Sequence, residues 1–254
     1  MNISVRPLTN PPITEMALSV TLEVPAMSES AVDALVVQLD SGFQRFGTIQ
    51  SGLIGYNAKT DETHCAEPRQ WIGSRYRKDG NVYVSIHNVS TNAVVFACSL
   101  LRPYESWEVF TQVALPYMRK VCVSIEPTKC HRFGVRTVNR LLPPPSDGKI
   151  PLRNVIKNVS HGITGIGEPD ICEFFHRDTL HLPDYEDLYV TIIRTTQPQQ
   201  GGKCPAVILD TDVYAYGDVV LANPEFDSLL QKVHMVRNKV FFDSIGDVCL
   251  EGCR

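Results

Sequence analysis

The chain has 254 residues, of which 43% are hydrophobic and 20% are charged, and its formal net charge is −4. This composition is typical of a globular protein that forms one large domain or two fused halves. The negative net charge disfavours a general nucleic-acid-binding protein, which usually carries a basic surface. The sequence also lacks a run of roughly 18 apolar residues, so we expect no membrane-spanning helix.

The amino-terminal residues and the cysteines favour a cytoplasmic protein. Residues 1–12 have no apolar core of the kind found in a secretory signal. Eight cysteines are spread through the chain, and Cys98, Cys122 and Cys172 lie in apolar contexts typical of reduced thiols.

The first half of the chain predicts a strand, a helix, three strands and a second helix. The breaker Asn10-Pro11-Pro12 precedes the first strand, Ser28 or Ser30 can cap the first helix, and Asp79-Gly80-Asn81 indicates a tight hairpin. We expect a linker over about 47–61. The expected strands cover 13–24, 69–78, 82–89 and 93–101, and the second helix covers about 105–123.

The second half of the chain predicts the same order. A strand over 132–142 leads to a short helix or turn near 152–159, and Asn223-Pro224-Glu225 indicates the start of a final helix. The strands between them are expected at 172–182, 188–196 and 206–214. The sequence therefore predicts an α+β protein of two tandem related β-α-β-β-β-α halves, 1–128 and 129–254. Each half would have its own antiparallel sheet, and a ligand or partner would bind in the cleft between them.

Three arginines share one face of the strand at 132–142. Period-two alternation places Arg132, Arg136 and Arg140 opposite an apolar face that includes Phe133, Val135, Thr137 and Leu141. Three guanidinium groups on one face need anionic partners, which could be protein carboxylates, phosphates or another surface.

Two aspartates are candidates for that role. Asp210 and Asp212 lie two residues apart on a strand and hence on the same face. They could hold a divalent metal or act in acid–base chemistry. Pairing with Arg132, Arg136 or Arg140 from another strand is the favoured interpretation, because half-buried charges are normally paired.

A basic and aromatic strand at 69–78 is a further candidate binding surface. Alternation predicts that Trp71, Arg75 and Arg77 share one face. This face is similar to a platform for single-stranded nucleic acid, but it has fewer aromatic residues than base stacking needs. His176 and His181 would lie on opposite faces of a strand, so they do not predict a metal site. We expect no cofactor and no metal. The glycine-rich stretch 162–167 is a candidate partner-binding loop.

Five stretches resemble a sporadically distributed family of uncharacterised prokaryotic proteins of similar length. They are NPPITE at 10–15, PYESW at 103–107, RFGVRTVNR at 132–140, ILDTDVY at 208–214 and NKVFFDSI at 238–245. The resemblance implies no activity, but the scattered distribution of the family implies genes that travel with mobile elements or antiviral-defence systems.

These observations together predict a non-catalytic binding or interaction protein with a protein partner. One alternative is a nucleic-acid-binding sensor or processing subunit that uses the arginine-rich strand. A second alternative is a metal-dependent enzyme centred on Asp210 and Asp212.

Overall fold

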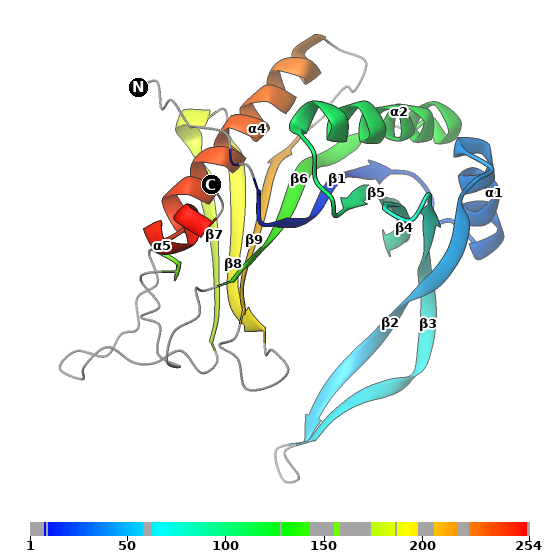
Figure 1. Cartoon of the computed structure of the whole chain (residues 1–254). Helices are drawn as coiled ribbons and strands as arrows, with labels where there is room; N and C mark the ends of the chain where they lie inside the picture. Colours follow the sequence, from blue (N-terminus) through cyan, green and yellow to red (C-terminus); the bar gives the residue numbers. More distant parts are fainter. Residues whose placement is uncertain are drawn as a thin grey trace.

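A computed structural model describes most of the chain, and it shows one nine-stranded antiparallel sheet with helices packed on it (Figure 1). The described residues are 8, 10–57, 62–127, 129–142, 155–157, 174–185, 187–197, 206–217 and 224–252. The strands are β1 (Ile13–Glu23), β2 (Gln44–Asn57), β3 (Glu62–Lys78), β4 (Val82–Ser90), β5 (Ala93–Leu101), β6 (Cys130–Leu141), β7 (Phe175–Leu182), β8 (Leu188–Gln197) and β9 (Ala206–Tyr216). The helices are α1 (Glu29–Leu39), α2 (Trp107–Ile125), α4 (Pro224–Ser244) and α5 (Asp247–Gly252), with a 3-10 turn at Pro183–Tyr185.

The expectation of two halves with separate sheets is wrong. The strand order is β2-β3-β4-β5-β1-β6-β9-β8-β7, so strands from both halves of the chain belong to one continuous sheet. Strands β1 and β6 pair antiparallel there, from Ile13 opposite Asn139 to Leu22 opposite Cys130. Backbone hydrogen bonds therefore occupy the place where the sequence suggested a cleft between two sheets.

The predicted order of elements is also wrong in the first half. Residues 44–57 form strand β2, where a linker was expected over 47–61, and β2 pairs with a β3 that begins at Glu62. Gly47, Ser51 and Gly55 weaken the strand pattern in the sequence, but pairing with β3 supplies the backbone hydrogen bonds that β2 needs. Most of the helix or turn expected near 152–159, and the loop at 162–167, lie outside the described residues.

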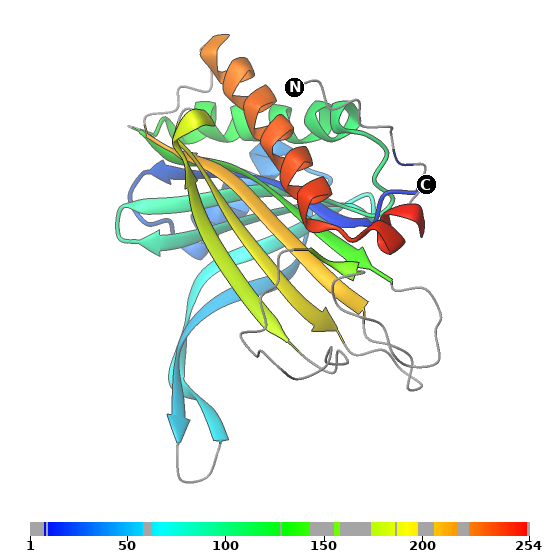
Figure 2. The same cartoon turned by 90° about the vertical axis from the view of Figure 1, so that its left-hand side faces the viewer.

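Helices α1, α2 and α4 pack on the same face of the sheet and cover its core (Figures 1 and 2). This face of β1 carries Met16, Leu18, Val20 and Leu22, all fully buried. On β6, Phe133 meets Phe226 of α4 edge to face, with ring centroids 4.9 Å apart. None of the helices in the described ranges is long and apolar enough to cross a membrane.

The local signals at turns and helix starts are confirmed. Ser28 caps α1 by accepting a hydrogen bond from the Ala31 amide at 3.2 Å, and Ser106 caps α2 in the same way through Val109. The β3–β4 hairpin turns at Asp79 and Gly80, both of which have positive φ. Helix α4 begins at Pro224, as the Asn-Pro-Glu signal predicted.

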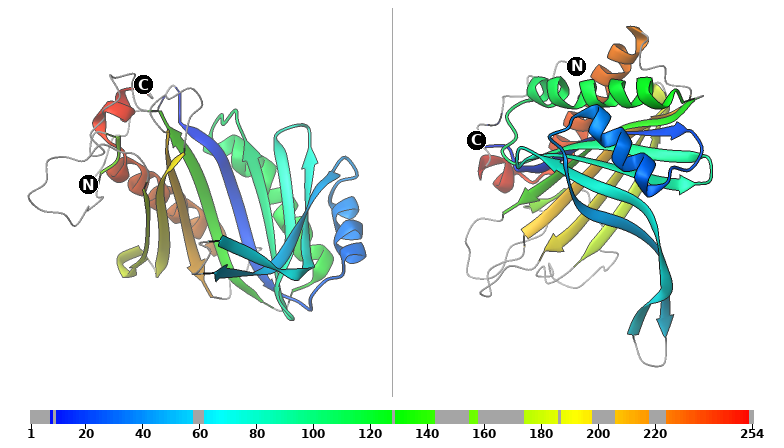
Figure 3. Two further views of the ribbon diagram at one scale, coloured as in Figure 1. Left: turned by 90° about the horizontal axis from the view of Figure 1, so that it is seen from below. Right: turned by 90° about the vertical axis from the view of Figure 1, so that its right-hand side faces the viewer.

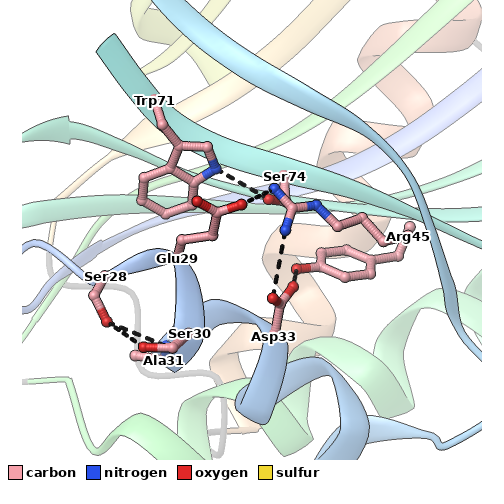
Figure 4. A network of polar contacts seen from close by, with 9 residues as sticks. Ser28, Glu29, Ser30, Ala31, Asp33, Arg45, Trp71 and Ser74 are labelled. Atoms are coloured by element: carbon pink, nitrogen blue, oxygen red, sulfur yellow. Dashed lines mark hydrogen bonds and ion pairs between the residues drawn. The ribbon is translucent and has the colours of Figure 1, made fainter.

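Strands β2 and β3 extend beyond the rest of the sheet as a two-stranded ribbon that points away from the helices (Figures 1 and 3). A polar network fastens the base of this ribbon to α1 (Figure 4). Arg45 of β2 pairs with Glu29 and Asp33 of α1, and the Tyr76 hydroxyl of β3 donates to Asp33. Burial first, and then this hydrogen bond, raise the pKa of Tyr76 to about 12.

Gly73 of β3 lies too close to strand β4 to carry a side chain. A Cβ there would lie 2.3 Å from the carbonyl oxygen of Ile86 and 2.3 Å from the Cβ of His87. We predict that Gly73→Ala lowers the free energy of unfolding by about 3 kcal/mol, measured by urea denaturation. Gly47→Ala is the matched control, because a Cβ at Gly47 meets nothing within 4 Å. An equal loss in both variants would show that general loss of ribbon flexibility, and not the close contact, determines the effect.

Candidate functional site

No described helix covers the face of the sheet opposite α1, α2 and α4 (Figure 3). This face carries most of the residues that the sequence suggested as a binding surface. The pairing register places Arg132 and Arg136 of β6 on this face, together with Asp210 and Asp212 of β9. We call it the open face. Its centre carries small side chains, which include Ala17, Ser19, Ala97 and Gly134.

The arginines and aspartates of the open face pair with one another, which confirms the favoured interpretation of the sequence. Arg136 binds Asp210 through two hydrogen bonds of 2.9 and 2.6 Å, and Arg132 binds Asp212 at 2.6 Å. The third arginine, Arg140, donates to the Gln197 side chain at 3.2 Å. The hydrogen bond to Asp210 raises the pKa of Arg136. Each pair cancels its own charge, so this part of the open face offers little net positive field to a phosphate backbone.

A row of aromatic rings continues from Arg132 across β9, β8 and β7. The Arg132 guanidinium lies 4.1 Å from the centre of the Tyr214 ring, Tyr214 stacks on Tyr189, and Tyr189 stacks on His181. Tyr216 meets both tyrosines edge to face. The Tyr214 ring is buried between Arg132 and Tyr189, so its faces are occupied. A nucleic-acid platform instead needs exposed ring faces on which bases can stack.

The predicted basic and aromatic face of β3 is only partly correct. Arg75 and Arg77 are exposed on the open face, but Trp71 packs against the core near α1 and donates to Ser74 at 3.2 Å (Figure 4). A bulge between Trp71 and Gly73 reverses the alternation there. Four strand spacings, roughly 19 Å, separate β3 from β6, so the two groups of arginines do not form one basic patch.

The described residues offer no metal centre of three or more histidine, cysteine or carboxylate ligands. Asp210 and Asp212 are engaged by arginines, and His176 and His181 lie on opposite faces of β7, as their spacing predicted. Cys98, Cys122, Cys130 and Cys249 form no disulfide bonds with one another. Burial raises the pKa of Cys98 to about 12, so this thiol is unsuited to nucleophilic chemistry. Cys172 lies outside the described residues.

A pocket of about 340 Å³ lies on the helix-covered face, between the start of α2, the second half of α4 and the central strands β6 and β9. The segment before β1 closes one side, where Pro12 accepts a hydrogen bond from the Arg140 amide at 2.9 Å. The volume is within the range of small-molecule sites. Its walls are Leu8, Pro11, Pro12, Ile13, Tyr104, Glu105, Ser106, Trp107, Glu108, Thr137, Asn139, Thr211, His234, Arg237, Asn238, Phe241 and Phe242.

Three polar side chains of the two central strands line this pocket with unpaired oxygens. Thr137, Asn139 and Thr211 are 3%, 1% and 1% exposed, and Thr137 and Thr211 lie directly opposite each other on β6 and β9. The hydroxyls of both threonines and the Oδ1 of Asn139 have no hydrogen-bond partner. An unpaired buried polar group costs about 1–3 kcal/mol, so three in one place call for an explanation.

A buried arginine of α4 lies beside these groups. Arg237 is 7% exposed and donates to Asn238 Oδ1 at 2.5 Å and to the Met16 sulfur at 3.4 Å. Its guanidinium lies 5.3 Å from the centre of the Trp107 ring, and His234 stacks on that same ring at 4.2 Å. Burial lowers the pKa of Arg237, while Tyr104 partly offsets that effect. The Asn238 amide nitrogen donates to His234 Nε2 at 3.0 Å, so Nε2 is the accepting nitrogen and the proton of the neutral His234 ring lies on Nδ1.

Sequence reasoning missed this pocket, although one signal was present. Thr137 and Asn139 occupy the apolar face of the 132–142 strand, where the alternation calls for hydrophobic residues. Arg237 gave no signal, because an arginine in a helix is usually exposed. All five stretches that carry the family resemblance contribute residues to the pocket walls.

Comparison with known proteins gives no relatives from which a function could be transferred. No protein-family model matches the chain, and a search of curated proteins found no significantly similar sequence. The resemblance to the prokaryotic family therefore stays a prediction.

The unpaired hydroxyls should weaken the folded state. We predict that Thr211→Val, and separately Thr137→Val, raise the free energy of unfolding by up to about 1 kcal/mol, because valine removes the unpaired group and keeps the shape. Thr191→Val is the matched control, since the Thr191 hydroxyl is 3.2 Å from that of Thr179. This control should lose stability. Losses in all three variants, measured by urea denaturation, would show that the pocket hydroxyls have partners in solution.

His234 should make the protein sensitive to acid. Burial first, and then the nearby Arg237, lower its pKa from 6.5 to about 4. Between these values the unfolded chain binds more protons than the folded chain, so stability falls as pH falls from 6.5 toward 4. We predict that the urea midpoint of His234→Gln falls less than that of the wild type between pH 7 and pH 5. Above pH 7 the difference between the two proteins should not change with pH, and an equal fall in acid would contradict the assignment.

Proposed function

We propose that this protein is a non-catalytic binding protein and that the pocket between α2, α4 and the central strands holds its ligand. The observation that carries this proposal is the set of three buried, unpaired oxygens on Thr137, Asn139 and Thr211. A bound molecule with matching hydrogen-bonding groups would remove the energetic penalty that the free protein bears.

Binding is favoured over catalysis by the chemistry of the pocket walls. His234 and Arg237 both line the pocket. The pKa of His234 is lowered to about 4, and a guanidinium keeps its proton, so neither group is suited to general acid–base work near pH 7. Thr137 and Thr211 are not hydrogen-bonded to a base that would activate them as nucleophiles.

A protein partner on the open face is a second proposal of the same kind. Tyr189, Tyr214 and Tyr216 form an aromatic cluster there, and tyrosines are enriched at protein interfaces. The pairing of Arg132 and Arg136 with aspartates favours a protein over a nucleic acid as the partner. We further propose a cytoplasmic location and, from the family resemblance alone, a role in a mobile-element or antiviral-defence system.

The pocket proposal can be tested by thermal denaturation with a library of small molecules. A true ligand at 100 times its Kd should raise the Tm by roughly 5–10 °C. The matched control is the double variant Thr137→Val/Thr211→Val, which we expect to be at least as stable as the wild type but to respond less to the ligand. Mass spectrometry of the recovered ligand should show it unchanged.

Three outcomes would contradict the proposal. A ligand that stabilises both proteins equally binds elsewhere, and a chemically altered ligand would indicate an enzyme. If no library compound binds and the protein purified from its host carries no additional mass, the pocket is a water-filled part of the core.

A further inference from the structure

The geometry points to a small monocarboxylate as the ligand of this pocket, with its carboxylate group beside Arg237 and a hydrogen-bond donor facing Thr137, Asn139 and Thr211. This inference rests on the proposed function and adds the chemical class of the ligand. A free organic acid and the carboxyl terminus of a short peptide share this chemistry.

Arg237 is 7% exposed and carries a positive charge that its described contacts do not balance. Among the described residues its contacts are the Met16 thioether, the Asn238 amide, the Tyr104 phenol and the Trp107 ring, none of which carries a formal negative charge. Buried charges are normally paired with an opposite charge. A guanidinium has five N–H donors, and a planar carboxylate can accept two of them at once.

The charges of the pocket walls favour an anion with a single negative charge over one with two. His234 is neutral near pH 7, so Arg237 supplies a single positive charge to the interior of the pocket. Glu105 and Glu108 are exposed at the start of α2 and add negative charge to the pocket wall. A monocarboxylate balances one guanidinium, whereas a phosphate monoester brings a charge of about −1.5 to −2 at pH 7 and would meet repulsion.

The remaining walls define the body of the ligand. The threonine hydroxyls can donate or accept, and Asn139 Oδ1 accepts, because its Nδ2 donates to the Leu209 carbonyl at 3.3 Å. The ligand should therefore carry at least one hydrogen-bond donor in addition to its carboxylate. Ile13, Phe241 and Phe242 supply apolar surface, so the rest of the molecule should be apolar.

A purely structural role for Arg237 makes a different prediction. If the Trp107 ring and the surrounding dipoles satisfied the guanidinium, Arg237 would stabilise the free protein, and its replacement would unfold it. If a ligand supplies the missing charge, the free protein bears a buried unpaired cation, and a neutral residue of similar length should be tolerated.

The test is binding of N-acetyl amino acids and of the matched N-acetyl amino acid amides, which have the same body without the negative charge. The chain has two tryptophans, so Trp71→Phe leaves Trp107, beside Arg237, as the only tryptophan reporter. Circular dichroism would check the fold of this background. We expect one or more of the acids to change the fluorescence and raise the Tm, the matched amides to do neither, and 4-hydroxyphenyl phosphate to bind less well than 4-hydroxybenzoate.

Two variants test the role of Arg237. Arg237→Met should remain folded and weaken binding of the best acid by roughly tenfold to a hundredfold, because charged hydrogen bonds are lost. Asn238→Asp places a carboxylate where Oδ1 now accepts at 2.5 Å from the guanidinium. This internal anion should pair with the guanidinium and reduce acid binding to a similar extent, and His234, which loses the Nδ2 donor, should carry its proton on Nε2 instead.

The outcomes separate the inference from the proposed function. If neutral molecules bind in the pocket and acids do not, or if both variants bind the acid as the wild type does, the carboxylate inference is wrong and the proposed function stands. Preference for the phosphate would overturn the charge argument in the same way. If acids, amides and the compound library all fail to bind, both proposals fail.

A short peptide with a free carboxyl terminus can be compared with the same peptide amidated at that terminus. If the free form binds better than the amidated form and better than free acids, the inference is supported and the source of the carboxylate is a peptide terminus.

Discussion

The pairing of β1 with β6 is the interaction on which the rest of the structure depends. It joins strands that are more than a hundred residues apart in the sequence and makes one sheet from the whole chain. Because the sheet is continuous, α2 and α4 pack side by side on one core, and their facing surfaces enclose the pocket above β6 and β9. The pocket that can hold a ligand therefore lies between α2 from the first half of the chain and α4 from the second half.

Local structure was predictable where a few neighbouring residues determine it. Ser28 caps α1, Asp79 and Gly80 turn the hairpin, and the period of the 132–142 strand separates Phe133 from the arginines. Pairings between distant strands were not predictable. The glycines of β2 give a weak strand signal, because its pairing with β3 and not its own propensity stabilises it. The bulge beside Trp71 likewise depends on which residue of β2 lies opposite.

The two groups of candidate site residues differ in predictability for an electrostatic reason. Arg136 and Asp210 lie on strands whose same-face positions carry opposite charges, which predicts an ion pair. The structure contains this pair. Arg237 has no such partner in the sequence pattern, and its burial follows only from how α4 lies over Trp107. Asn139 was the available clue, since a polar amide on the buried face of a central strand needs a specific reason.

The pocket and the open face are built from the same strands, and this links the two proposed sites. Thr211 lies between Asp210 and Asp212, and Thr137 follows Arg136, so consecutive side chains on β6 and β9 point alternately to the pocket and to the arginine–aspartate pairs. A central pair of strands, hydrogen-bonded on both sides, shifts little when one face is contacted. Such a frame holds Thr137 and Thr211 in place without a ligand, which lowers the ordering cost of binding. The same rigidity explains how the fold tolerates three unpaired oxygens, because neighbouring strands prevent β6 and β9 from moving to satisfy them.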